Sequence, residues 1–313
     1  MNQFILQCEV GKENQILPYC DAIILGGNAS FSTSFLNAFT AYSNHFKGLS
    51  AGFVDLPADF EQQVMLIRHC IQRGSKVILL GATWQHYQKL ASSLTSVHVL
   101  SNRIEEYEAA VITHFLGFQR HLVSTEKIYE IEQHSSDSAS LGLLTEDFSN
   151  AEACLRTSNT LFIDASVCKA AHVPGYGRCE PSGLEPEQLI QLVRYASHSP
   201  HLSLIGFGID NNHFDAQNCG SLMKIYATCI WYVLEGLNHG SYTAHSATET
   251  TFVNLQDYDE ILEFAFDGQA DKWWVRIQQD PESSFIACTA NDHEEAVKGS
   301  LTPRLHRYLF EMR

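Results

Sequence analysis

Short apolar runs alternate with helix-like segments along the first three quarters of the chain. A run of four or five apolar residues between turn signals fits a strand that is buried on both faces, as in a parallel sheet. Between these runs, apolar residues recur at helical spacing, as at Phe35, Leu36, Phe39, Tyr42 and Phe46. This alternation predicts a three-layer α/β/α fold around a doubly wound, mostly parallel sheet.

The expected elements of this domain follow from the apolar runs and their turn signals. The clearest strand of the N-terminal half is 76–80, which reads KVILL. The other expected strands are 22–25, 52–56, 97–100, 111–117, 141–144, 161–164 and 201–207. The expected helices are 33–46, 58–73, a short one after residue 86, another short one capped by Ser124, 147–155, 183–195 and 221–237.

The composition changes after residue 238. A polar loop is expected over 240–249, followed by short strands at 261–266, 272–277 and 285–288 and a helix near 292–298. We therefore divide the chain into an α/β domain, residues 1–240, and a small β-rich C-terminal extension, residues 241–313, that packs on it.

Composition and charge exclude several classes of protein. With 313 residues, 45% of them hydrophobic, the chain can bury a large core. A formal net charge of −16 argues against nucleic acid or an anionic membrane as the main partner, because both require a basic surface. The start of the chain lacks a basic segment followed by an apolar one, and no apolar run approaches eighteen residues. These features predict a cytoplasmic protein.

The nine cysteines are scattered along the chain and include no C-x-x-C pair. This spacing predicts neither a zinc site nor a disulfide framework. Cys168 and Cys179 flank the stretch discussed next, and a nucleophilic role for one of them is a further alternative.

The stretch 159–184 carries the strongest indication of a functional site. The strand expected at 161–164 ends in Asp164, and ligands of parallel α/β sheets bind outside the carboxyl ends of the strands. Ser166 follows two residues later, so that both side chains point to the same side if the extended geometry continues. Asp164 is therefore a candidate for binding a metal or a substrate. A cap on the next turn is the other interpretation, and both remain open.

An ordered series of motifs resembles the ureohydrolase superfamily, which includes arginase, agmatinase and formimidoylglutamase. The series consists of LFIDAS at 161–166, VPG at 173–175, SGL at 182–184, the turn around 206–211 and the long apolar helix after it. It is similar in order and spacing to the S-F-D-x-D, A-P-G, G-G-L and E-x-N-P motifs of that family. The KWW sequence at 272–274 also resembles the tail of a bacterial arginase-like subgroup with degenerate metal motifs.

The resemblance implies an arginase-like fold, assembly into homo-oligomers, and hydrolysis of C–N bonds in linear amidines. Enzymes of the family use two manganese ions to turn a bridging water into hydroxide, with carboxylate and imidazole ligands that suit such ions. The family ligands lie in the motifs G-G-x-H, D-x-H-x-D and D-x-D. The corresponding residues here are Trp84 for the first histidine; Ser101, Arg103 and Glu105 for the second motif; and Asp164 and Ser166 for the third. Ile209 stands where the substrate-binding glutamate is expected.

Only two carboxylates, Glu105 and Asp164, remain at the six ligand positions, and two ligands cannot hold a pair of manganese ions. Arg103 places a fixed cation there and is expected to pair with one of these two carboxylates. The sequence thus predicts a ureohydrolase-fold protein without the manganese centre or hydrolase activity, with a binding or assembly role and a small-molecule ligand in the remodelled pocket.

The alternative is a divergent metal-dependent amidino or formimino hydrolase. In that case manganese is held by His86, Glu105, Asp164 and Asp210. An ordinary surface histidine at position 86 and a turn at 210–212 are equally compatible with the sequence. His172 lies in the loop before Pro174, a region that contacts substrate in the family, and Asp210 and His213 are candidates for the pocket mouth.

Overall fold

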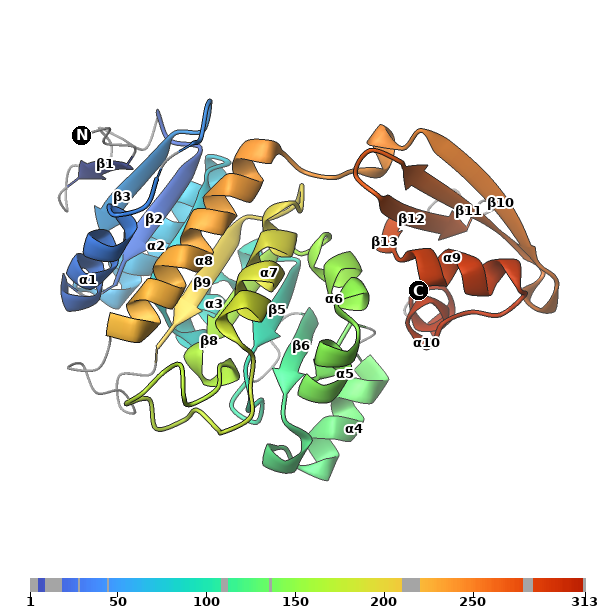
Figure 1. The fold of residues 1–313 in the computed structure, drawn as a ribbon, viewed down its shortest axis with the longest axis horizontal. Helices are drawn as coiled ribbons and strands as arrows, with labels where there is room; N and C mark the ends of the chain where they lie inside the picture. The colour runs from blue at the N-terminus through green and yellow to red at the C-terminus, as the bar shows by residue number, and fades with distance from the viewer. Residues whose placement is uncertain are drawn as a thin grey trace.

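The computed structural model describes residues 5–8, 19–27, 29–43, 45–107, 112–134, 137–209, 220–277 and 284–311. Within these ranges, the chain forms a large parallel sheet covered by helices and a smaller antiparallel sheet near the C-terminus (Figure 1). The α/β fold expected from the alternating pattern is confirmed.

Nine described strands make up the large sheet, and each recorded pair in it is parallel. Their order across the sheet is β1-β3-β2-β4-β9-β8-β5-β6-β7. The strands are β1 (Ile5–Cys8), β2 (Ala22–Gly26), β3 (Ala51–Asp55), β4 (Lys76–Ala82), β5 (Ser96–Leu100), β6 (Ile112–Phe118), β7 (Ala139–Ser140), β8 (Thr160–Asp164) and β9 (Leu204–Gly208).

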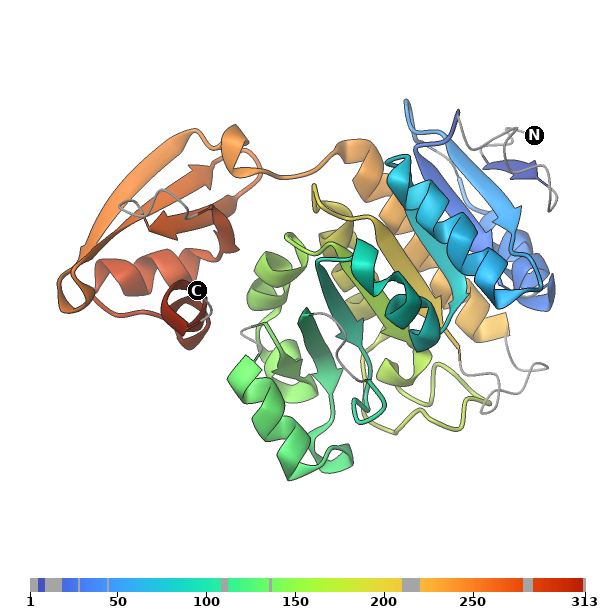
Figure 2. The same cartoon turned by 180° about the vertical axis from the view of Figure 1, so that it is seen from behind.

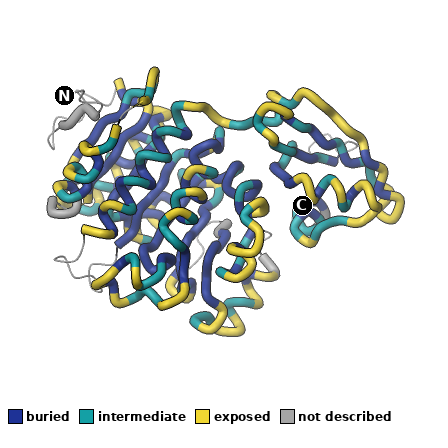
Figure 3. Tube along the Cα trace, viewed as in Figure 1, coloured by how far each residue is buried: buried dark blue, intermediate teal, exposed yellow. Residues whose placement is uncertain are grey.

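Helices cover both faces of this sheet. One face is packed by α1 (Ala29–Phe39), α5 (Leu141–Glu146), α6 (Phe148–Leu155), α7 (Pro186–Ser197) and α8 (Gly220–His239), and the other by α2 (Phe60–Gln72) and α3 (Trp84–Leu90). The helix α4 (Thr125–His134) follows β6. Strands β2, β8 and β9 are buried at every residue because they are covered from both sides (Figure 3). This burial explains why their sequences are apolar runs.

Local signals define several helix ends. Asp59 caps α2 by accepting a hydrogen bond from the amide of Gln62 at 2.9 Å. Gly74 follows the same helix with a φ of +84°, a left-handed conformation that favours glycine. Pro186 occupies the first turn of α7, where its missing N–H costs no hydrogen bond.

The strand expected at 141–144 is wrong, because this segment belongs to α5. Leu144 points into the core while Gly142 and Leu143 are exposed, and a run of four residues is too short to distinguish helix from strand by its periodicity. A two-residue strand, β7, precedes it and extends the parallel sheet at its edge.

The C-terminal part contains a four-stranded antiparallel sheet (Figure 2). Its strands are β10 (Glu249–Leu255), β11 (Glu260–Asp267), β12 (Lys272–Ile277) and β13 (Ile286–Cys288). The helices α9 (Ala290–Val297) and α10 (Pro303–His306) cover one face, and the last described turn is Arg307–Glu311. The other face meets α6, where Ala153 packs in one cluster with Ala265, Trp274 and Ala287. None of the described helices is both long enough and apolar enough to span a membrane.

Candidate functional site

A cavity of about 470 Å³ opens at the carboxyl edge of the large sheet. It lies where β4, β8 and β9 end, the position at which open α/β sheets bind ligands. Its wall includes Trp84, Glu106, Tyr107, Asp164, Arg178 and Ile209.

Asp164 is the last residue of β8, and its carboxylate is almost fully enclosed, with 6% exposure. Its Oδ1 accepts the backbone N–H of Ser166 at 2.8 Å and the hydroxyl of Tyr176 at 3.2 Å. Its Oδ2 accepts the hydroxyl of Tyr107 at 3.1 Å. Both oxygens are thus already engaged by the protein. Asp164 caps the turn that follows β8 and also lines the cavity.

Two serines lie beside Asp164. The hydroxyls of Ser101, after β5, and Ser166 are 3.3 Å apart and fully buried. Ser101 donates to the backbone carbonyl of Arg103 at 2.7 Å, and the Tyr107 hydroxyl is 3.4 Å from its oxygen. Burial, followed by the charge of Asp164, raises the pKa of Tyr107 well above its usual value, so that its hydroxyl stays protonated as a donor.

An aromatic wall stands at the end of β4. Trp84 begins α3, and its ring centroid lies 5.0 Å from that of Tyr107 and 6.1 Å from that of Phe162. Ile209, just after β9, is 4% exposed and adds an apolar surface. A large ring and an aliphatic chain therefore occupy the positions at which the resemblance predicts a metal-binding imidazole and a substrate-binding carboxylate.

The cation that faces Asp164 is Arg178. Its guanidinium bonds both carboxylate oxygens of Glu106, at 3.1 and 2.5 Å, and its side chain is 11% exposed. Burial alone lowers the pKa of Arg178, but the hydrogen bonds to Glu106 and the charges of Asp164 and Glu106 outweigh it and raise the pKa. Arg178 is therefore a permanent positive charge in the cavity wall.

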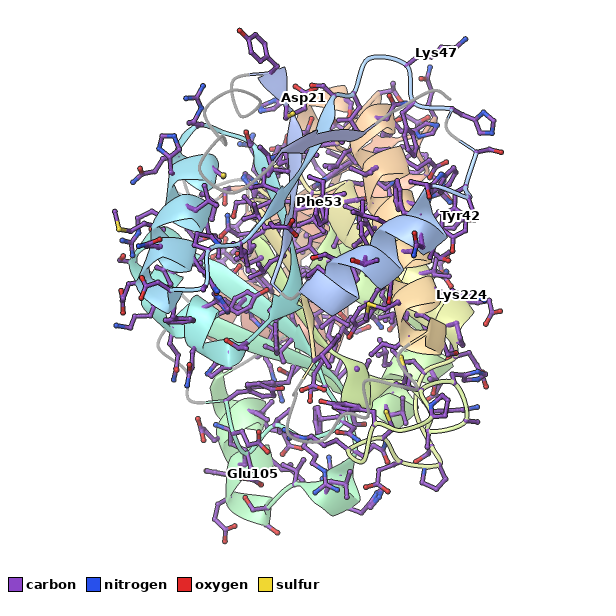
Figure 4. The ribbon with its side chains drawn as sticks, turned by 90° about the vertical axis from the view of Figure 1, so that its left-hand side faces the viewer. Asp21, Tyr42, Lys47, Phe53, Glu105 and Lys224 are labelled. Atoms are coloured by element: carbon purple, nitrogen blue, oxygen red, sulfur yellow. The ribbon has the colours of Figure 1, made fainter. Side chains whose placement is uncertain are left out.

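The predicted pairing of Arg103 is wrong. Its Nη2 binds Oε1 of Glu180 at 2.8 Å, and neither Asp164 nor Glu105 is its partner. Glu105 lies beside α4 (Figure 4), where its carboxylate accepts the backbone N–H of Ser124. The turn that follows β5 directs Glu105 outward and brings its neighbour Glu106 to the cavity instead.

His86 is also held outside the cavity. Its Nδ1 accepts the backbone N–H of Thr83 at 3.1 Å, and its Nε2 lies 3.0 Å from Oε1 of Gln63. Both ring nitrogens are thus used in fixing the start of α3 on α2. Burial lowers the pKa of His86 to about 4, so the ring is neutral at pH 7.

The remaining candidates are dispersed. His172 pairs with Glu185 at 2.5 Å, away from the cavity wall. Asp210 and His213 lie outside the described residues. Burial is the main cause that raises the pKa of Cys168 and, to about 12, that of Cys179, which leaves both as thiols rather than nucleophilic thiolates.

The described residues at this edge do not supply the donor set of a pair of manganese ions. Such a pair needs several oxygen and imidazole donors directed at one point. Among the described residues, no group of three such donors gathers around Asp164, and both oxygens of Asp164 are engaged by hydrogen bonds. We therefore derive no step through a metal at this edge.

The fold is that of the ureohydrolases, the arginase and formimidoylglutamase class. The chain superposes on formiminoglutamase from Trypanosoma cruzi, solved with manganese, with a TM-score of 0.58 and 11% identity over 71% of this chain and 94% of that one. Formimidoylglutamase from Bacillus subtilis superposes with a TM-score of 0.54 and 14% identity, over 77% of this chain and 90% of that one. Arginase from the same organism superposes with a TM-score of 0.52 and 11% identity, over 68% of this chain and 97% of that one. No family model and no curated protein matches the sequence.

Of the residues that the sequence singled out, Trp84, Asp164 and Ile209 lie in the wall of this cavity. Sequence reasoning missed Tyr107 and Arg178, which reach the cavity from loops. A tyrosine or arginine in a loop has no spacing that predicts its direction. The one usable signal was the Gly-rich and Pro-rich loop 174–183 that carries Arg178, since functional residues concentrate on loops of that kind.

Proposed function

We propose that this chain keeps the ureohydrolase fold but uses the carboxyl edge of its sheet to bind a small molecule, without a manganese pair and without hydrolase activity. The observation that carries the proposal is the hydrogen bonding of Asp164 by Tyr107 and Tyr176. These hydroxyls and the amide of Ser166 occupy the carboxylate that would otherwise serve as a metal ligand.

The cavity wall supports a ligand with an apolar, flat portion and an anionic group. Trp84 and Ile209 offer apolar surface, and Arg178 offers a fixed cation whose planar guanidinium suits a carboxylate. The ion pair with Glu106, which is 59% exposed, is weak enough in solvent for a ligand carboxylate to compete with it. We propose that the protein is cytoplasmic. We also propose that this edge binds a small molecule, and that neither nucleic acid nor a membrane is the partner.

The decisive experiment measures metal content and turnover together. Protein purified with manganese supplied throughout is expected to hold no stoichiometric manganese and to release neither urea from arginine nor formamide from N-formimino-glutamate. About two manganese ions per chain together with release of either product would overturn the proposal and establish a divergent amidine hydrolase.

A pair of variants sharpens this test. Asp164→Asn is expected to destabilise the protein by about 1–3 kcal/mol, because two tyrosine hydroxyls lose a charged acceptor. Glu105→Gln, outside the cavity, is the matched control and should leave ligand binding unchanged.

A thermal-shift assay with aromatic carboxylates such as benzoate tests the binding step. The rise in melting temperature caused by the carboxylate should be smaller in Arg178→Met than in the wild type. A rise of equal size in that variant contradicts the assignment of Arg178.

A further inference from the structure

Three polar side chains line up across the edge of the large sheet, toward the amino ends of its strands. His98 of β5 pairs in register with His114 of β6, and their ring centroids are 4.8 Å apart. Leu116 pairs with Ala139 of β7, so Asp137, two residues before Ala139, continues the row formed by His114, two residues before Leu116. This row faces the layer formed by α5 and α6, not the carboxyl-edge cavity.

A fourth group comes from the helix layer. Cys154 of α6 lies over the row, and the potential ligand atoms of His98, Asp137 and Cys154 all lie within 4.8 Å of one another. All three residues are buried, at 2%, 5% and 2% exposure. Imidazole, carboxylate and thiolate are a donor set that zinc accepts.

His98 supplies the second, independent observation. Both of its ring nitrogens are buried, and neither has a hydrogen-bond partner among the described residues. An imidazole enclosed in this way forfeits the hydrogen bonds that water would give it, at a cost of about 1–3 kcal/mol. A buried polar group of this kind indicates a missing partner, and an ion between His98 and the two neighbouring donors would engage one of its two ring nitrogens.

We propose that His98, Asp137 and Cys154 bind one zinc ion. Tetrahedral zinc with bonds of about 2.0–2.3 Å holds its donors about 3.5 Å apart, so the three side chains need to approach one another by about an ångström. On binding, the thiol of Cys154 gives its proton to solvent and the sulfur forms the bond to zinc. A separate cavity of about 420 Å³, whose wall includes Asp137 and Cys154, gives the ion a route to this point.

The C-terminal part of the chain supports the site from outside. Arg304 of α10 donates from Nε to Oδ1 of Asp137 at 2.8 Å, and its Nη1 donates to the carbonyl of Ala287 at 3.1 Å. Hydrogen bonds of this type orient ligating carboxylates in metal sites. Zinc would therefore join the large sheet, α6 and, through Arg304, the C-terminal sheet. The scattered cysteine spacing gave no sign of the site, because its donors come from separate elements.

The test begins with the unmodified full-length protein. After exposure to zinc and gel filtration, elemental analysis is expected to give one zinc per chain, with no manganese retained under the same conditions because thiolate favours zinc. Cobalt substituted for zinc is expected to show the charge-transfer absorption of a cobalt–thiolate bond. Absence of stoichiometric zinc, or a cobalt complex without that absorption, overturns the proposal, and neither result depends on a variant that folds.

Variants then assign the ligands. His98→Gln and Cys154→Ala are each expected to weaken zinc binding by at least about 10- to 100-fold, the loss caused by removing even an outer partner of a metal site. Cys229→Ala, an equally buried cysteine on α8, is the matched control and should retain zinc. Unchanged zinc affinity in both ligand variants, with native circular dichroism, overturns the assignment. Because the site is remote from the carboxyl edge, these outcomes are independent of the proposed ligand-binding function.

Discussion

At the residue scale, His86 combines a structural role with a clear titration. Its unfolded-state pKa is about 6.5, and its folded-state pKa is lowered to about 4. Between these values the unfolded chain binds more protons than the folded one, so the free energy of unfolding falls as the pH drops. Well above pH 6.5 the ring is neutral in both states and makes no pH-dependent difference.

The variant His86→Gln isolates this contribution. Glutamine at the third position of a helix also reaches back to the N-cap amide, here that of Thr83, so the capping box is kept. The wild type is expected to lose about 3 kcal/mol more than this variant between pH 6.5 and pH 4. Urea denaturation at several pH values measures the difference, and parallel curves for the two proteins contradict the prediction.

The same scale shows how far sequence reasoning can locate a site. Trp84, Asp164 and Ile209 lie in the wall of the cavity, at or just after the ends of β4, β8 and β9, where open α/β sheets bind ligands. The pairing expected for Arg103 was wrong and Glu106 was not considered, because beyond the strand end the turn geometry decides which carboxylate faces the cavity. Such a turn is set by contacts with distant loops, as the hydrogen bond donated by the backbone N–H of Ser124 to the Glu105 carboxylate illustrates.

At the scale of elements, the loop after β8 is held by a close backbone approach. Gly183 lies so near this loop that an added Cβ would come within 2.7 Å of the carbonyl carbon of Cys168 and the amide of Lys169. Gly183→Ala is therefore expected to destabilise the protein by about 1–3 kcal/mol. Gly142 of α5 has nothing within 4 Å of the same position, so Gly142→Ala should be neutral or stabilising by up to about 1 kcal/mol. Equal effects of the two changes in denaturant titrations would contradict this explanation.

Arg156, which ends α6, binds that helix to the C-terminal sheet. Its Nη2 donates to the carbonyls of Trp273 and Cys288, both at 3.1 Å, and its guanidinium lies 4.6 Å from the ring of Trp274. Its Nε also forms an ion pair with Oε1 of Glu152 at 3.1 Å. Arg156→Met removes these contacts and is expected to cost about 3 kcal/mol, while Glu152 keeps Lys272 as a partner at 3.5 Å.

Amide hydrogen exchange tests the role of Arg156. Faster exchange is expected in β12 and β13 of the Arg156→Met protein, because the carbonyls bound by Arg156 belong to these strands. Arg194 is the control, since its side chain is 49% exposed in its ion pair with Glu235 and Arg194→Met should cost less than about 1 kcal/mol. Unchanged exchange in β12 and β13 would show that other contacts hold the sheet.

Elements were predicted best where burial imposed a period. Strand β12 was predicted to the residue, and the apolar runs of β2 and β8 to within one. Strand β10 was missed because it is an edge strand, exposed at all but Val253 and Leu255, and its sequence is therefore largely polar. Residues 141–144 of α5 were predicted as a strand because four apolar and small residues fit the two-residue period of a strand as well as the 3.6-residue period of a helix.

At the scale of the whole molecule, the two sheets are joined through buried charge. The Arg304 to Asp137 ion pair connects α10 to the edge of the large sheet, with side-chain exposures of 10% and 1%. A pair enclosed in this way stabilises the protein little compared with apolar residues of the same size, but removing one partner leaves an uncompensated buried charge. The connection between the two sheets is therefore expected to be weakened when either Arg304 or Asp137 is replaced alone, and to be weakened less when both are replaced together.

A double-mutant cycle exposes this asymmetry. Arg304→Met alone, studied with a chelator present to exclude metal, is expected to cost about 3–5 kcal/mol because the Asp137 carboxylate loses its counter-charge. Adding Asp137→Asn to that variant removes the charge and should restore part of the stability, which appears as a coupling energy between the two positions. Arg307→Met is the matched control, since Arg307 lines the cavity of about 420 Å³ that Asp137 and Arg304 also line, but the ion pair of Asp137 is with Arg304. If the single and double variants unfold at the same denaturant concentration, the two sheets are held together by apolar contacts such as those of Ala153 and Trp274, and not by this pair.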